Sequence, residues 1–168
     1  MKRLEIFLLA LIFSLLFFTS SCREGIKFYD DEKAMVTDAK TKINTIITKE
    51  FKVIFDGAEN YSLIDCREPN EFIESHIPGA INIPRGLLEF KIGNLVPRRY
   101  KVIIYSQNGD RSALAAANLI KLKYSYVNSI DGGLQEWLKE YPELVEEGAG
   151  EADEAAPAPK EESGGCGG

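Results

Sequence analysis

The fold is decided by the stretch KVIIYSQNGDRSALAAANL, which covers residues 101–119. Its run of β-branched and aromatic residues from Val102 to Tyr105 predicts a buried strand, and the alanine-rich part from Ser112 onward predicts a helix. The polar loop between them consists of Ser106, Gln107, Asn108, Gly109, Asp110 and Arg111. A strand that passes through a tight loop directly into a helix leaves backbone N–H groups pointing into the loop, at the positive end of the helix dipole. We therefore expect the loop and Ser112 to bind an anion.

Three residues of this stretch suit that role. Gly109 allows a backbone conformation with positive φ, and Ser112 is expected to be the N-cap of the helix. Arg111 adds a permanent positive charge at the rim of the loop. It has two interpretations, because it could contact a bound oxyanion or hold the loop through a carboxylate such as Glu68.

Hydrophobic patterns predict strands and helices in alternation along the rest of the chain. Strands are expected at residues 46–47, 61–65, 80–83 and 126–130. Helices are expected with Thr48 as a cap, from Pro69, along Leu87, Leu88 and Phe90, and after Gly132-Gly133. This order implies an α/β fold, in which a parallel sheet of four to five strands has helices on both faces. Ligands of such sheets bind at the carboxyl ends of the strands, where the loop begins.

Motifs on both sides of the loop form a specific signature when taken together. They are Leu63-Ile64-Asp65-x-Arg67-Glu68-Pro69-x-Glu71-Phe72, His76-Ile77-Pro78-Gly79-Ala80 and Gly132-Gly133-x-x-x-Trp137. With the loop, they resemble the rhodanese family of sulfurtransferases over residues 43 to about 141. The resemblance implies the three-layer rhodanese-like fold. It also implies structural roles for the motif residues Asp65, Arg67, Glu68, His76, Gly79, Gly132, Gly133 and Trp137, with Asp65 and Arg67 in a buried polar network.

The family carries Cys-x-x-Gly-x-Arg-Ser in this loop, and its Cys holds sulfur as a persulfide. The position of that Cys is Ser106 here. A thiol with a pKa of about 8.5 supplies a nucleophilic thiolate, whereas a serine hydroxyl is a far weaker acid and its oxygen carries no stable persulfide. Ser106 therefore cannot perform the family's reaction. The serine has two alternative explanations, which are natural loss of the Cys and its engineered replacement.

Two other enzyme classes fit poorly. A serine hydrolase needs a base beside Ser106, and the single histidine, His76, belongs to a turn motif of the family. Phosphatase loops begin with Cys and place one more residue before the Arg.

The remaining cysteines each have two interpretations. Cys66 follows the strand at 61–65, where we expect a buried apolar residue, the alternative being a displaced nucleophile near the loop. Cys166 lies in the terminal sequence GGCGG. It is either a mobile thiol that accepts sulfur, exchanges disulfides or captures a metal, or part of a disordered tail that forms only adventitious disulfides. If the tail is a flexible segment of about 20 residues, its root-mean-square end-to-end distance is roughly 25 Å.

The two ends of the chain differ in composition from its middle. Residues 1–21 have a positive start, an apolar run at 6–18 and small residues after it, which predicts a secretory signal. Cys22 then resembles the lipidated Cys of a bacterial lipoprotein, although Thr19 replaces the usual Leu; an ordinary signal with an incidental Cys22 is the alternative. We expect a spacer at 22–42, the rhodanese-like domain at 43–142 and a disordered acidic tail at 143–168.

Charge and composition narrow the function. Residues 22–142 carry 17 acidic and 17 basic side chains, so no nucleic-acid surface is expected. We expect no cofactor and no metal site, because the His and Cys residues are widely separated. One hypothesis is an exported, lipid-anchored protein of the cell envelope or periplasm that binds a small sulfur species, an oxyanion or a partner protein's thiol. The other is a sulfurtransferase or thiol-redox protein that uses Cys166 or Cys66. The oligomeric state stays open.

Overall fold

The structure is a computed structural model that describes residues 26–148. The expectations for the signal peptide, Cys22 and Cys166 lie outside the described residues. The chain divides into two units between Asp30 and Asp31, and all helices and strands named below belong to the second unit. Within residues 26–148, no helix combines the length and the apolar character needed to cross a membrane.

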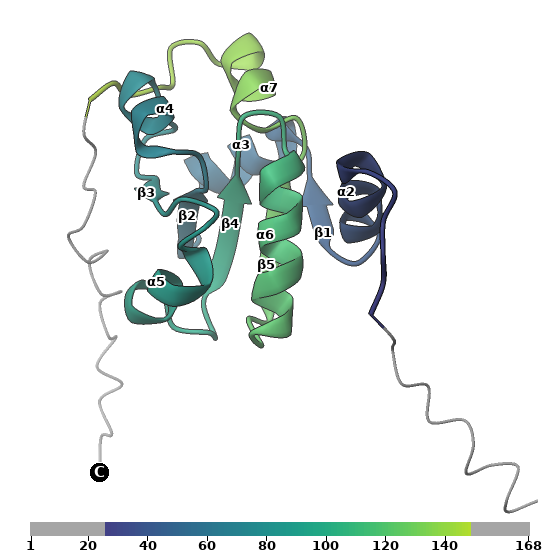
Figure 1. The fold of residues 1–168 in the computed structure, drawn as a ribbon. Helices are drawn as coiled ribbons and strands as arrows, with labels where there is room; N and C mark the ends of the chain where they lie inside the picture. Colours follow the sequence, from purple (N-terminus) through teal and green to yellow (C-terminus); the bar gives the residue numbers. More distant parts are fainter. Residues whose placement is uncertain (1–25, 149–168) are drawn as a thin grey trace, which may run out of the picture. The chain divides into compact units, whose positions relative to one another are not determined.

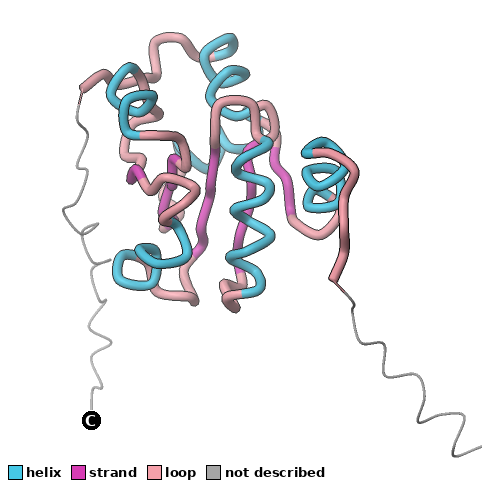
Figure 2. The backbone as a smooth tube through the Cα atoms, viewed as in Figure 1, coloured by secondary structure: helices cyan, strands magenta, loops and turns pink. Residues whose placement is uncertain are grey.

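Five parallel strands form one sheet in the order β1-β5-β4-β2-β3 (Figures 1 and 2). They are β1 (Asn44–Ile46), β2 (Tyr61–Asp65), β3 (Ile81–Asn82), β4 (Lys101–Tyr105) and β5 (Tyr126–Ile130). Strand β4 is central, with β2 and β5 as its neighbours. Since parallel strands end at the same edge of a sheet, the loop after β4 lies in the middle of that edge.

Helices cover both faces of this sheet. They are α2 (Glu32–Lys40), α3 (Thr48–Asp56), α4 (Pro69–Glu74), α5 (Leu88–Leu95), α6 (Asp110–Lys121) and α7 (Gly133–Glu140). Ile104 packs with Leu88 and Leu119 in one core, and Ile103 packs with Phe51 and Trp137 in a second core. Neighbouring residues of β4 thus enter different cores, which explains its continuous apolar run. The expected α/β fold, a parallel sheet with helices on both faces, is confirmed.

Some local expectations need correction. Helix α3 begins at Thr48 and has Ile47 as its N-cap, so Thr48 is helical rather than a cap. Strand β1 ends at Ile46 and does not reach Ile47. Phe90 is 80% exposed and does not share the buried face of α5, because Leu88 and Ile92 form that face.

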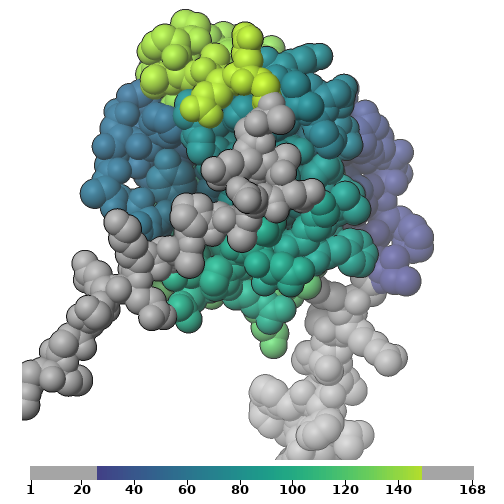
Figure 3. Space-filling model, turned by 90° about the vertical axis from the view of Figure 1, so that its left-hand side faces the viewer, coloured from purple at the N-terminus to yellow at the C-terminus, as the bar shows by residue number. Residues whose placement is uncertain are grey.

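The folded unit includes residues on both sides of the predicted domain. Helix α2, from the predicted spacer, packs against α6. At the other end, Leu144 packs against the second core, and Glu146 exchanges two backbone hydrogen bonds with His76, of 2.8 and 2.9 Å. Figure 3 shows this C-terminal segment, in yellow, against the blue-green surface around α4. Gly148 N–H donates to the carbonyl of Ile73 at 2.8 Å, so the described chain ends beside α4.

Candidate functional site

The loop after β4 turns sharply into α6. Ser106 is fully buried, and its Oγ accepts a hydrogen bond of 3.3 Å from the backbone N–H of Ser112. Gly109 has φ 89°, a left-handed conformation that favours glycine. Asp110 is the first helical residue, so the strand-to-helix connection is only four residues long.

Ser112 is not the N-cap of α6, because Gly109 occupies that position. Ser112 lies in the first helical turn, where its buried hydroxyl donates to the Gly109 carbonyl at 3.0 Å. It also accepts a hydrogen bond of 2.9 Å from the hydroxyl of Ser129, on β5. These two buried hydroxyls therefore connect the carbonyl of Gly109 to strand β5.

The loop rests directly on the main chain at the start of α7. The carbonyls of Ser106 and Gln107 accept hydrogen bonds from Leu134 N–H and Gln135 N–H, both of 2.9 Å. A Cβ atom on Gly133 would lie 2.1 Å from the Ser106 carbonyl oxygen. The close approach of two backbones therefore requires glycine at 133 and sets the shape of the loop.

Four backbone N–H groups of the loop lack a hydrogen-bond partner within the described part of the chain, and one of them belongs to the buried residue Gly109. Among the described residues, no acceptor is found for the N–H groups of Gln107, Asn108, Gly109 and Arg111. By contrast, Asp110 N–H donates to the side-chain oxygen of Asn108 at 3.2 Å. With the dipole of the 12-residue helix α6 behind them, the four groups form a concentrated region of positive partial charge.

Arg111 is engaged in a bidentate ion pair with Glu71. Its two terminal nitrogens donate to the two carboxylate oxygens at 2.8 and 2.6 Å. This interaction holds the pKa of Glu71 at about 2 and raises the pKa of Arg111. The partner is thus Glu71 rather than Glu68, because the first turn of α4 directs Glu71 toward α6. The backbone N–H of Glu68 donates to the same carboxylate at 3.0 Å.

A second ion pair lies beneath the loop. Arg67 and Asp65 are almost completely buried, and their closest contact is 2.7 Å. Arg67 also donates to the Ser75 carbonyl at 2.6 Å and to the side-chain oxygen of Gln107 at 3.2 Å. The pair therefore joins the end of β2, the end of α4 and the loop.

Cys66 and His76 are both buried. Cys66 belongs to the first core, and burial raises the pKa of its thiol to about 12. His76 is buried, stacks on Phe72 with 3.8 Å between ring centroids, and has Nδ1 2.9 Å from the Phe72 carbonyl oxygen. Its Nε2 lies 3.6 Å from the Glu146 carboxylate.

The other motif residues lie in the scaffold around the site. Gly79 and Gly132 have φ of 76° and 73° in turns. Trp137 is fully buried, and its indole N–H donates to the Leu144 carbonyl at 2.8 Å. Over the part of the chain that the structure describes, no group of three or more His, Cys, Asp or Glu residues is placed to hold a metal ion.

Sequence reasoning missed two contributors to the site. Ser129 is a buried polar residue of β5 and follows Asn128 in the sequence, so no single polar residue in an apolar run marks it as a partner of Ser112. Lys40 contacts Asp110 and Asp131 at the rim of the loop, and no local pattern indicates this.

Comparisons with known proteins agree with this geometry. The family model described as "Rhodanese-like domain" matches residues 48–140. The Bacillus subtilis protein YrkF, provisionally named a sulfur carrier protein, is 31% identical over 97 residues, and this chain spans only about half, 52%, of its length. A protein of Allochromatium vinosum named "Sulfurtransferase" is 29% identical over 97 residues, which cover 58% of this chain and 90% of that protein. The structure of a thiosulfate sulfurtransferase from Pseudomonas aeruginosa aligns with a TM-score of 0.63 at 22% identity, over 70% of this chain and 23% of the other. The chain belongs to the family of rhodanese-like domains.

Proposed function

We propose that this domain binds a small oxyanion or sulfur-containing anion in the loop at residues 106–112 and does not itself transfer sulfur. The observation that carries the proposal is that four loop N–H groups have no acceptor among the described residues, while a serine occupies the start of the loop. The N–H groups supply an anion site, while the Ser106 hydroxyl cannot form a persulfide. The loop therefore keeps the groups that bind an anion and lacks the thiol that sulfur transfer requires.

The charges around the loop support a site for a compact anion. Both nearby arginines, Arg67 and Arg111, already have carboxylate partners at 2.7 and 2.6 Å. The attraction for an anion thus comes from main-chain N–H groups and the helix dipole, which act over short distances. Such a site favours thiosulfate, sulfate or a deprotonated thiol over a large polyanion.

A second candidate function is sulfur transfer or thiol redox chemistry through Cys166. The favouring observation is that the described chain ends with Gly148 bonded to Ile73 on α4, the helix that carries Glu71. Cys166 follows 18 residues later in the sequence. Cys66 is a weaker candidate, because its thiol is buried.

We also propose that the protein is exported and held at a membrane by a lipid on Cys22. The support is the composition of residues 1–22, a positive start and an apolar run followed by small residues and Cys. Metabolic labelling with a fatty acid tests this, since label should enter the wild type and be absent from Cys22→Ser. Equal labelling of both proteins contradicts it.

The central experiment uses the fragment 22–168 with Cys22→Ser, which retains the second unit entire. We expect this parent fragment to bind thiosulfate in isothermal titration calorimetry and to form no thiocyanate from thiosulfate and cyanide. With Ser106→Cys, we expect thiocyanate and sulfite to form, because the introduced thiolate can take the outer sulfur and pass it to cyanide.

Two outcomes would overturn the proposal. If the parent fragment forms thiocyanate and Cys166→Ser abolishes the activity, the second candidate function replaces it. If the parent fragment binds no thiosulfate and Ser106→Cys shows no activity, the loop is not an anion site.

A further inference from the structure

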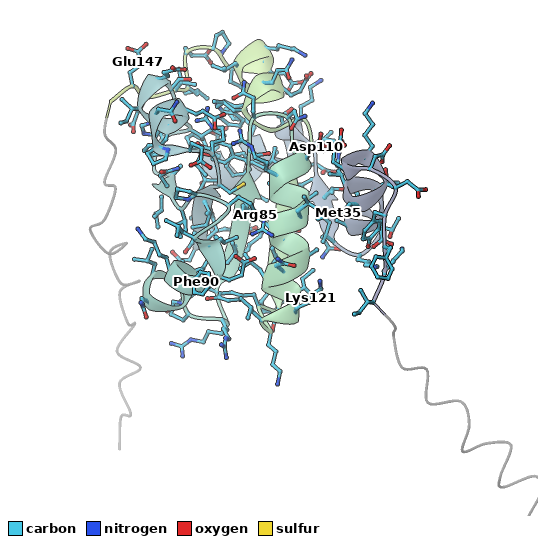
Figure 4. The ribbon with its side chains drawn as sticks, viewed as in Figure 1. Met35, Arg85, Phe90, Asp110, Lys121 and Glu147 are labelled. Carbon is cyan, nitrogen blue, oxygen red and sulfur yellow. The ribbon has the colours of Figure 1, made fainter. Side chains whose placement is uncertain are left out.

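The last residue of α2 reaches the rim of the loop from outside the matched part of the chain. Helix α2 ends at Lys40, whereas the family match begins at residue 48. The Lys40 ammonium lies 3.1 Å from a carboxylate oxygen of Asp131 and 3.4 Å from one of Asp110. Figure 4 shows Asp110 at the end of α6 that faces α2.

The two carboxylates belong to the two segments that build the site. Asp110 is the first residue of α6, and its carboxylate accepts a hydrogen bond of 2.8 Å from the Asn108 side chain, within the loop. Asp131 comes directly before Gly132-Gly133, and its N–H donates to the Ile46 carbonyl at 2.9 Å. One ammonium group therefore joins the loop to the turn on which it rests.

The charge of Lys40 matters because of its position. Although partial burial opposes protonation, the hydrogen bond and charge of Asp131, with a smaller contribution from Asp110, raise the pKa of Lys40. Lys40 is thus charged at neutral pH. Without it, two carboxylates would stand beside the loop N–H groups and repel an incoming anion.

We propose that Lys40 is a positioning residue of the anion site, which compensates Asp110 and Asp131 so that the loop accepts a small dianion. The inference rests on the proposed function of the loop and adds α2 as a third side of the site. All three side chains are 35 to 52% exposed, so solvent screens the interaction. We expect Lys40→Met to weaken thiosulfate binding by about two- to fivefold.

The test compares Lys40→Met with Lys42→Met in the fragment 22–168 carrying Cys22→Ser. Lys42 provides a matched control, since it has the same charge two residues further on and contacts Asp38 at 2.7 Å. Calorimetry with thiosulfate should show weaker binding for Lys40→Met alone, and the difference should shrink at high salt. Lys40→Arg should retain the affinity of the parent fragment.

A second readout does not depend on ligand binding. In a background with Ser106→Cys and Cys166→Ser, the introduced thiolate is itself an anion in the loop. Its pKa is measured from the thiolate absorbance at 240 nm, to which Cys66, with a pKa of about 12, adds little. Lys40→Met should raise this pKa, and Lys42→Met should not. If the parent fragment binds no thiosulfate, the proposed function fails, while this pKa still decides the role of Lys40.

A charge-restoring variant separates electrostatics from folding. If Lys40 acts by compensating carboxylates, then Lys40→Met combined with Asp131→Asn should recover most of the lost affinity and lower the raised thiol pKa. Equal values for Lys40→Met and Lys42→Met in both readouts would overturn the inference. So would a loss of affinity in Lys40→Met that Asp131→Asn leaves unchanged.

Discussion

Arg111 and Glu71 face each other across the rim of the site, where Nη1 of the arginine donates to Oε2 of the glutamate at 2.8 Å and Nη2 donates to Oε1 at 2.6 Å. Arg111 is the second residue of α6, and Glu71 lies in the first turn of α4. The pair therefore joins two helix N-termini and compensates the charge of Arg111.

The pair makes stability depend on pH in the acidic range. The hydrogen bond from Arg111 lowers the pKa of Glu71 from 4.5 to about 2. A lowered folded-state pKa means that the stabilisation is complete above pH 4.5, decreases as the pH falls, and is lost below about 2. We expect Glu71→Gln to cost about 1 kcal/mol at pH 7. In thermal unfolding, the difference between the two proteins should shrink between pH 5 and pH 3, and a constant difference would contradict this account.

Glu71→Gln should also strengthen anion binding. Loss of the Glu71 negative charge leaves the Arg111 charge uncompensated beside the four loop N–H groups. We therefore expect thiosulfate affinity to rise by about threefold or more. Glu74→Gln, on the same helix and exposed, is the matched control and should leave the affinity unchanged. Calorimetry at low ionic strength measures both; a lower affinity for Glu71→Gln would show that the ion pair holds the loop open.

Gly133→Ala should disrupt the loop. The added Cβ would lie 2.1 Å from the Ser106 carbonyl oxygen, at a position where φ is 57°. Overpacking and the left-handed backbone together predict a loss of about 2–4 kcal/mol and of thiosulfate binding. Gly93→Ala is the control, because a Cβ there meets nothing within 4 Å and the residue lies inside α5. It should stabilise the protein by about 0.5–1 kcal/mol in chemical denaturation, and equal stability of the two variants would refute the packing argument.

Cys66 should react only after unfolding. With a pKa of about 12, its thiolate fraction at pH 8 is on the order of one in ten thousand, and its side chain is inaccessible. In the fragment 22–168 with Cys22→Ser and Cys166→Ser, it is the only cysteine left of three. Modification by a disulfide reagent should be at least about a hundredfold slower in the native protein than in guanidinium. Comparable rates would mean that this thiol reaches solvent near the loop.

Lys123→Gly should stabilise the domain. Lys123 follows α6 with φ 67°, and among the described residues it is the one non-glycine with positive φ. Its N–H donates to the Ile120 carbonyl, and Tyr124 N–H donates to the Leu119 carbonyl, a C-terminal motif that prefers glycine at this position. We expect a gain of about 1 kcal/mol in urea unfolding. Lys121→Gly, within the helix, should instead lose about 1 kcal/mol.

Local sequence carries much of this architecture. The run Val102 to Tyr105 predicts β4, Pro69 predicts the start of α4, and Gly109 predicts the left-handed turn, because each feature depends on neighbouring residues. The choice between Glu68 and Glu71 as partner of Arg111 depends on the orientation of α4 against α6, which no local pattern contains.

The contributions that sequence could not predict all come from distant segments. Lys40 is 70 residues from Asp110 in the chain, and Ser129 is 17 residues from Ser112. Leu144 lies in a stretch whose composition indicates a tail, yet it packs on the second core. Burial of such residues depends on where distant chain segments come into contact, and only the folded structure shows those contacts.

The contact between Gly133 and the loop has an evolutionary consequence. The shape of the loop is set by main-chain contacts that leave no room for a side chain at position 133. The identity of the reacting atom depends instead on the side chain at position 106. Serine and cysteine codons can differ by a single base. One mutational step can therefore exchange the reacting atom at position 106 in either direction without changing the main-chain contact at Gly133.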